Sequence, residues 1–185
     1  MINIDVDQLT QRFAEWVMNP TLLKKVIPLI QPRLDRLSDI GQFSEIFLGG
    51  NINVDISLYQ HKKLSPEEVK NTLIWGLWKL DEQTVWSSEN IQTVLRDCAE
   101  ALEFKLRDFL FAYYPALTGK KSATPLFETM NILGKDLVRA RLRNSIDQLG
   151  GLSKKAESRL KRTYQESWKK LTHRRDLKNK DSQES

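Results

Sequence analysis

Apolar side chains recur every three or four residues along most of this chain, and this spacing restricts its fold more than any other feature. Such spacing lines one face of an α-helix, whereas the alternation typical of strands is scarce here. The clearest stripe belongs to a helix predicted from Trp86–Glu89 to about Tyr113. It contains Ile91, Val94, Leu95, Cys98, Leu102, Leu106, Phe109 and Leu110. The spacing therefore predicts an all-α fold.

Capping residues mark several helix boundaries. In Ser65-Pro66-Glu67-Glu68, serine can cap a helix, proline fits its first turn, and two acids favour the positive end of its dipole. Thr124-Pro125 opens a short helix that Gly134 closes. These signals also predict a loop over residues 115–124 and a helix over about residues 136–149.

The first 50 residues are predicted to form three helical segments, the first two separated at Asn19-Pro20. The second, over residues 21–37, should be interrupted by Pro28 and Pro32, because each proline removes a backbone donor. The third should begin at Ser38-Asp39 and leave through a left-handed turn at Gly49-Gly50. The expected buried side chains are Leu9, Phe13, Trp16 and Val17 in the first segment, and Ile40, Phe43, Ile46 and Phe47 in the third.

Glycine and polar residues over 49–63 mark an internal boundary. We therefore predict two small helical subdomains, residues 1–63 and 64–152, followed by a basic region over residues 153–185. That region should begin with an amphipathic helix capped by Ser153 and become disordered from about His173. Its apolar face would carry Leu160, Tyr164, Trp168 and Leu171.

The positive charge of the chain is concentrated at its C-terminal end. Residues 153–185 hold eleven Lys and Arg against five Asp and Glu, a net charge of +6, so the rest of the chain contributes −1 to the total of +5. A basic tail of this kind indicates attraction to a phosphate-bearing polymer, although a solvated helix face is also common.

The sequence contains no recognisable catalytic constellation. Its single cysteine, Cys98, lies in the apolar stripe, where a core thiol is a simpler interpretation than a nucleophile. His61 and His173 are far apart, and the common nucleotide, zinc and metalloprotease motifs are absent. We therefore expect no cofactor, no metal site and no enzymatic activity from this chain by itself.

No apolar run reaches the roughly 20 residues needed to cross a bilayer. The acidic N-terminus also lacks the basic and apolar regions of a secretory signal. These observations predict a cytoplasmic protein with no membrane partner, which we expect to be a monomer.

One group of motifs is more specific than composition. The chain contains Ala116-Leu117-Thr118-Gly119, then Leu126-Phe127-Glu128, Leu133-Gly134-Lys135 and Arg141-Leu142, in that order. Upstream lie the segments 22–39 and Trp86–Ile91. Together these elements resemble the C-terminal anticodon-binding region of bacterial glutamyl-tRNA synthetases over about residues 8–152.

The resemblance implies a helical-cage fold and a tRNA-binding module that reads the anticodon of glutamate tRNA. Carried over by position, Arg33 is a candidate anticodon contact, and the loop over residues 123–126, with Thr124 and Leu126, should approach the unstacked bases. A surface ion pair for Arg33 and core packing for Leu126 remain open alternatives. The other basic candidates for RNA contact are Arg139, Arg141, Arg143, Lys154 and Lys155, of which the arginines could equally be solvated or support the loop.

Tyr114 departs from the family pattern, which commonly places an arginine four residues before the threonine of the Leu-Thr-Gly turn. A tyrosine can stack on a base but cannot offer a charged, bidentate fork. We keep Tyr114 in the predicted RNA-binding set and expect that discrimination at one anticodon position is altered or lost.

The catalytic nucleotide-binding fold of the family does not occur in these 185 residues. Such a chain is either part of a longer glutamate-tRNA ligase or a free-standing relative, whose partner would be a separate catalytic synthetase chain. The alternative function is a helical protein-interaction scaffold that has lost anticodon reading.

Overall fold

The structure is a computed structural model that describes residues 5–17, 19–122 and 124–183. Within these ranges the backbone forms α-helices, short 3₁₀ helices and loops without any strand, so the all-α prediction is confirmed. No helix in the described ranges is long and apolar enough to span a membrane.

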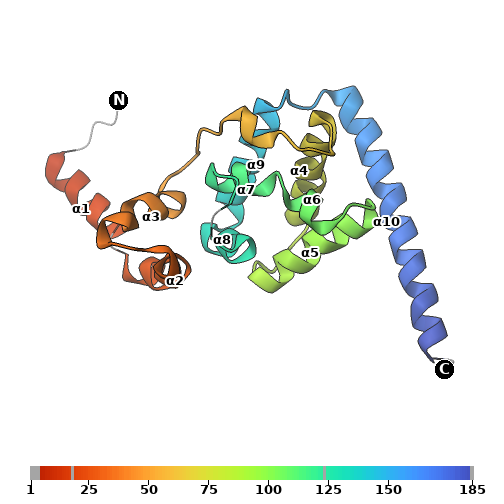
Figure 1. Ribbon diagram of the computed structural model, residues 1–185, viewed down its shortest axis with the longest axis horizontal. Coiled ribbons are helices and arrows are strands. Elements are labelled where there is room, and N and C mark those ends of the chain that lie inside the picture. Colours follow the sequence, from red (N-terminus) through yellow and green to blue (C-terminus); the bar gives the residue numbers. More distant parts are fainter. Residues whose placement is uncertain (1–4, 18, 123, 184–185) are drawn as a thin grey trace. The chain divides into compact units, whose positions relative to one another are not determined.

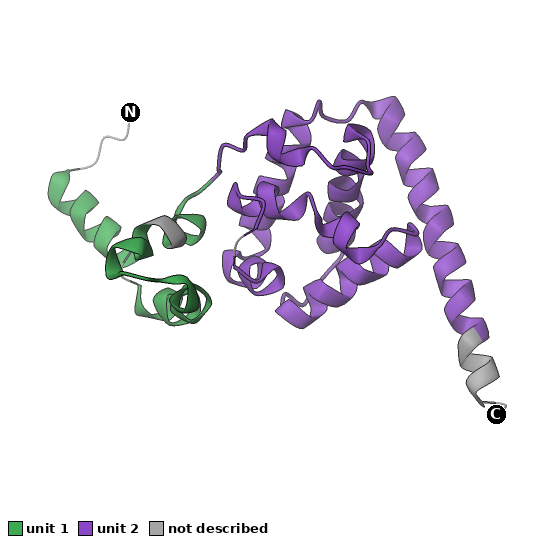
Figure 2. Ribbon diagram, in the orientation of Figure 1, with its two compact units in different colours: residues 1–50 green, residues 51–185 purple. Residues whose placement is uncertain are grey.

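The chain divides into two compact units, Met1–Gly50 and Asn51–Ser185 (Figure 2). The division falls within the predicted boundary over residues 49–63 but earlier than residue 63. Val54 and Tyr59, from the segment that follows Gly50, are 7% and 4% exposed and belong to the core of the second unit.

The first unit contains α1 (Val6–Val17), α2 (Pro20–Ile30), η1 (Gln31–Arg33), η2 (Leu37–Asp39) and α3 (Ile40–Leu48) (Figure 1). Asn19 caps α2 by accepting from the backbone N–H groups of Thr21 and Leu22 at 3.0 and 3.1 Å, as predicted. The predicted interruption at Pro28 is wrong, because α2 continues through it. Pro28 and Lys24 are exposed, so water can satisfy the Lys24 carbonyl that the proline leaves without a donor.

The apolar face of α1 is exposed rather than buried, which contradicts the prediction. Leu9, Phe13 and Trp16 are 49%, 60% and 52% exposed. The Val17 side chain lies outside the described residues. Helical periodicity identified the face correctly but could not show whether anything covers it.

In α3, Ile46 and Phe47 are buried as predicted and Ile40 is half-buried, whereas the Phe43 side chain lies outside the described residues. The predicted left-handed exit is wrong, since Gly49 has φ −77° and ψ 147°. A Cβ at Gly49 would lie 2.9 Å from the Glu45 carbonyl oxygen. The glycine therefore permits a close backbone approach rather than a left-handed turn.

The second unit builds one core from helices that follow one another closely in sequence (Figure 1). Its elements are η3 (Ile56–Tyr59), α4 (Pro66–Asp81), α5 (Ser88–Ala101), α6 (Leu106–Leu110), α7 (Tyr113–Thr118), α8 (Leu126–Leu133), α9 (Lys135–Gln148) and α10 (Lys154–Gln183). Helix α4 packs against α5 and α9, and the buried Tyr113 of α7 donates to the Thr72 carbonyl of α4 at 2.9 Å.

The predicted starts of α4 and α5 are confirmed. Ser65 and Glu68 form a reciprocal capping box at α4, with Pro66 in its first turn, and the Ser87 hydroxyl accepts from the Asn90 N–H at α5. The short helix between Pro125 and Gly134 and the helix over about residues 136–149 are also confirmed, as α8 and α9.

The single helix predicted from Trp86 to Tyr113 is wrong, because α5 ends at Ala101. Glu103 has φ 59°, and the Phe104 N–H bonds back to the Ala99 carbonyl at 2.9 Å. This bond and the left-handed Glu103 are typical of a Schellman helix end, in which glycine usually holds the left-handed position. Because glutamate holds that position here, no residue near Ala101 indicates that the helix ends.

Two further boundaries differ from prediction. Pro115 lies inside α7, and the loop begins only at Gly119, which has φ 69°. Helix α10 extends to Gln183, so the disorder predicted from His173 is wrong over residues 173–183; residues 184–185 lie outside the described residues. Leu171 is 1% exposed, which shows that packing extends close to His173.

Candidate nucleic-acid interface

The loop between α7 and α8 is held at its first end by the Leu-Thr-Gly turn. The Thr118 hydroxyl donates to the Tyr114 carbonyl at 2.7 Å and accepts from the Lys120 N–H at 3.3 Å. Gly119 takes the left-handed conformation that ends α7. The backbone after Gly119 therefore leaves the helix in a defined direction.

Arg141 supports the same turn from inside the core. Its side chain is fully buried, and its guanidinium donates to the Leu117 carbonyl at 2.6 Å. Burial lowers the pKa of Arg141 to about 10, so the side chain stays charged at neutral pH. The structure thus places this predicted RNA contact beneath the loop rather than on its surface.

Two threonines hold the second end of the loop. Thr124 is 1% exposed, and its hydroxyl lies 2.6 Å from the Thr129 hydroxyl, which itself donates to the Pro125 carbonyl at 2.6 Å. Since Thr129 has one proton to give, Thr124 is the donor in the hydroxyl pair. The adjacent Leu126 is 4% exposed and belongs to the core.

Lys121, Ser122 and Pro125 are the exposed described residues of this loop, while Lys120 is half-buried. The two lysines were not among the predicted RNA-binding residues, although their position between Gly119 and Thr124 could have indicated them. Ala123, part of the predicted base-reading segment, lies outside the described residues. Tyr114, half-buried at the base of α7, packs against the core cluster.

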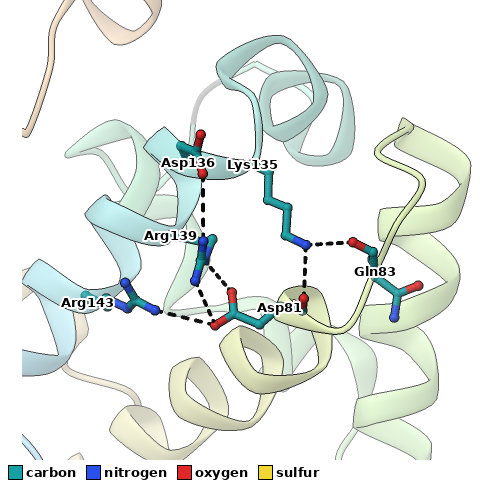
Figure 3. Close-up of polar contacts among 6 residues, drawn as sticks. All are labelled: Asp81, Gln83, Lys135, Asp136, Arg139 and Arg143. Atoms are coloured by element: carbon teal, nitrogen blue, oxygen red, sulfur yellow. Dashed lines mark hydrogen bonds and ion pairs between the residues drawn. The ribbon is translucent and has the colours of Figure 1, made fainter.

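The outer arginines of α9 converge on a single carboxylate (Figure 3). Arg139 forms an ion pair with Asp81, the last residue of α4, and Arg143 approaches the same carboxylate at 3.5 Å. Arg139 also lies 3.7 Å from Asp136. These contacts engage the charges of both predicted RNA-binding arginines within the protein.

Lys135 reinforces the same junction. Its ammonium group donates to the carbonyls of Asp81 and Gln83 at 3.0 and 2.6 Å (Figure 3). A cation at these carbonyls satisfies acceptors that a helix end leaves open and favours the negative end of the α4 dipole. The start of α9, and with it the α8–α9 corner, is therefore fixed to the end of α4.

The remaining predicted contacts lie elsewhere. Lys154 and Lys155 are exposed in the first turn of α10. Arg33 lies on the first unit at the end of η1, exposed, with its guanidinium donating to the Leu29 carbonyl at 3.2 Å. Within the second unit, the structure gathers Tyr114, Thr124, Leu126 and Arg141 around one loop.

The site provides cations, hydroxyls and backbone groups rather than reactive centres. Burial raises the pKa of the Cys98 thiol to about 12, which suppresses the thiolate. No cluster of potential metal ligands occurs among the described residues.

Comparison with known proteins identifies the family. A family model described as "Anticodon binding domain" matches residues 8–146. The chain belongs to this anticodon-binding family. The match contains α2 to α8 and nearly all of α9 but ends before α10.

The similar curated proteins are glutamate–tRNA ligases. The enzyme of Pseudomonas syringae pv. syringae is 37% identical over 153 residues, covering 83% of this chain and 31% of that protein. The enzyme of Pseudomonas aeruginosa (strain UCBPP-PA14) is 39% identical over 150 residues, covering 81% and 30%. The chain therefore spans about a third of the length of these relatives.

A solved structure shares the fold. The crystal structure of a glutamate tRNA ligase from Elizabethkingia meningosepticum, in complex with its amino acid, matches with a TM-score of 0.63 at 17% identity. The match covers 77% of this chain and 29% of that one. This match shows the fold, whereas the family model and the curated relatives confirm the family that the sequence motifs resemble.

Proposed function

We propose that this chain is a tRNA-binding module that recognises the anticodon of glutamate tRNA, as the non-catalytic region of a glutamate–tRNA ligase. The observation that carries this proposal is the anticodon-binding family match over residues 8–146. The similarity of this chain to glutamate–tRNA ligases of two Pseudomonas species supports glutamate tRNA as the ligand.

The loop between α7 and α8 suits the reading of unstacked bases. Both of its ends are fixed by hydrogen bonds, at Thr118 and Thr124, while Lys121 and Ser122 between them are exposed. Loop ends that are fixed before binding lose less conformational entropy when RNA docks. Base edges would then meet backbone groups and short polar side chains, as in other single-stranded RNA recognition.

The predicted residues divide into two roles in this proposal. The exposed residues Arg33, Lys154 and Lys155 contact RNA directly, and Tyr114 stacks on a base beside the loop. Buried residues act through the loop instead: Thr124, Leu126 and Arg141 hold its backbone. Arg139 and Arg143 fix α9 to α4 through Asp81.

Binding of glutamate tRNA with its own and with a swapped anticodon tests this function. We expect at least about tenfold tighter binding of the native anticodon, which corresponds to about 1.4 kcal/mol. Lys121→Gln should weaken binding, whereas Lys63→Gln, an exposed change outside the loop, should not. Equal affinity for both anticodons would contradict anticodon reading.

One observation favours the second candidate, a protein-interaction scaffold. Val6, Leu9, Phe13 and Trp16 form an apolar stripe along α1 at helical spacing and are 49–74% exposed. A separate catalytic synthetase chain is the partner that this candidate would engage. Co-purification of the two chains would support the scaffold over RNA binding under two conditions. Phe13→Asp should abolish it, and tRNA with a swapped anticodon should leave it unchanged.

A further inference from the structure

Helix α10, which begins after the family match ends, is docked by one apolar face. Tyr164 and Leu171 are 8% and 1% exposed. The Tyr164 ring packs edge-on against Trp78 of α4 at 5.7 Å and against Trp168 at 6.0 Å, both between ring centroids. Lys79 lies over the Trp168 ring at 4.4 Å. These contacts determine which side of α10 faces the core.

A charged clamp holds the same face further along the helix. Arg175 lies two turns beyond Trp168 and bonds to Asp97 and Glu100 of α5 at 2.7 and 2.8 Å. The hydrogen bond with Asp97, followed by that with Glu100, raises the pKa of Arg175. In Figure 1 one end of α5 lies next to α10, and the two helices make direct contacts. The orientation of α10 is therefore fixed along several turns.

The opposite face of α10 carries a line of cations. At 100° per residue it holds Lys155, Arg159, Arg162, Lys169 and Lys170, all exposed, which we call the basic ridge. From Lys155 to Lys170 the ridge is about 22 Å long at 1.5 Å per residue. Glu166 lies on this face too, 3.9 Å from Arg162.

The cations of the ridge do not stabilise the folded chain in any way that would account for their arrangement. Lys155, Arg159, Lys169 and Lys170 form no ion pair with any side chain in the described part of the chain. Like charges one helical turn apart, as in Lys155 and Arg159, destabilise a helix slightly. On the docked face, by contrast, Arg175 is neutralised by two acids. Four of the five ridge cations thus carry positive charge that no ion pair among the described residues neutralises.

We propose that the basic ridge of α10 binds the phosphate backbone of the tRNA whose anticodon is read elsewhere on the chain, an inference that rests on the proposed function. A straight row of cations matches a row of phosphates and reads no base edges. The ridge therefore adds affinity without adding anticodon specificity. It also provides contacts that lie outside the region shared with the family model.

The test compares two variants that lose the same charge. The ridge variant is Lys155→Gln/Arg159→Gln/Lys169→Gln/Lys170→Gln, and the control is Lys62→Gln/Lys63→Gln/Lys105→Gln/Arg107→Gln, whose side chains are all exposed on the same unit. Glutamine keeps helix propensity, and equal thermal melts would verify folding. Affinity for glutamate tRNA, native and anticodon-swapped, is measured between 50 and 200 mM salt.

We expect the ridge variant to lose about tenfold or more in affinity at low salt, and its slope of log affinity against log salt to fall by about 3. Its preference for the native anticodon should not change, and the control should bind like wild type. An unchanged slope of log affinity against log salt, or an equal loss of affinity in the control, overturns the proposal that the ridge binds phosphates. If wild type binds both anticodons equally but the ridge variant still loses affinity and slope, the ridge stands and anticodon reading fails. No binding by wild type overturns both.

Discussion

Helices α9 and α10 are both rich in basic residues, but the basic side chains of α9 contact protein groups, whereas several of those on α10 are exposed to solvent. On α9, Arg141 is buried against the Leu117 carbonyl, and Arg139 and Arg143 meet at Asp81. On α10, Arg175 is clamped by two acids of α5, while Lys155, Arg159, Lys169 and Lys170 of the basic ridge are exposed and form no ion pair among the described residues. The difference shows that a count of cations does not identify a phosphate-binding surface, because what matters is whether protein groups already neutralise them.

Thiol reactivity tests the closure of the core around α5, on which α10 docks, with the largest expected effect. Cys98 of α5 is fully buried in the core, and its thiol pKa is raised from 9.0 to about 12, mainly by burial. This shift lowers the thiolate fraction about a thousandfold. A colorimetric disulfide reagent at pH 8 should therefore react with the folded protein at least that much more slowly than with the protein in urea. Reaction of the folded protein at the unfolded rate would show that the core around α5 opens easily.

Arg141→Met should give the largest loss of stability. The substitution removes a fully buried guanidinium and leaves the Leu117 carbonyl without its donor, so unfolding in urea should show a loss of about 3 kcal/mol. Arg143→Met, two residues along the same helix, removes a side chain that is 55% exposed and should cost less than about 0.5 kcal/mol. Similar losses in both variants would contradict the different roles of the two arginines.

Trp168→Ala should loosen α10 while leaving α9 in place. Truncation removes the ring that packs on Tyr164 and under Lys79, and we expect a loss of about 2 kcal/mol for this half-buried side chain. The thiol of Cys98 should also react faster in this variant. Gln165→Ala, an exposed change on the neighbouring turn, is the control and should stay within about 0.5 kcal/mol of wild type.

Asp81→Asn should have the smallest effect on stability, about 1 kcal/mol, because the carboxylate and its partners are partly exposed. The loss should shrink in high salt. The same variant tests the roles of Arg139 and Arg143. If they are structural, releasing them leaves tRNA affinity unchanged or slightly weaker. Tighter tRNA binding would instead show that Asp81 competes with phosphate for these arginines.

Local signals predicted the fold well where capping chemistry was explicit. Ser65-Pro66-Glu67-Glu68 and Thr124-Pro125 marked helices that the structure contains. The end of α5 could not be predicted, because Glu103 takes a left-handed position that usually holds glycine. The exposed stripe of α1 and the length of α10 depend on what packs against them, which periodicity alone does not specify.

The sequence predicted where the candidate site lies better than it predicted the roles of the individual residues. The Leu-Thr-Gly and Leu-Gly-Lys motifs located the α7–α8 loop and the corner that follows it. The sequence could not show that Arg141 lies beneath this loop, since a basic residue in a helix is usually exposed. The contacts of Arg139 and Arg143 were likewise not predictable, because their partner Asp81 lies 58 and 62 residues earlier in the chain.

Chemical probing of glutamate tRNA bound to the purified chain would show whether the protein contacts the anticodon. Reagents that modify unpaired base edges and the phosphate backbone would be compared with and without protein. We expect protection of the anticodon bases, together with salt-sensitive protection of backbone phosphates that disappears in the ridge variant. Anticodon bases that remain fully reactive while the protein is bound would contradict anticodon recognition by this chain.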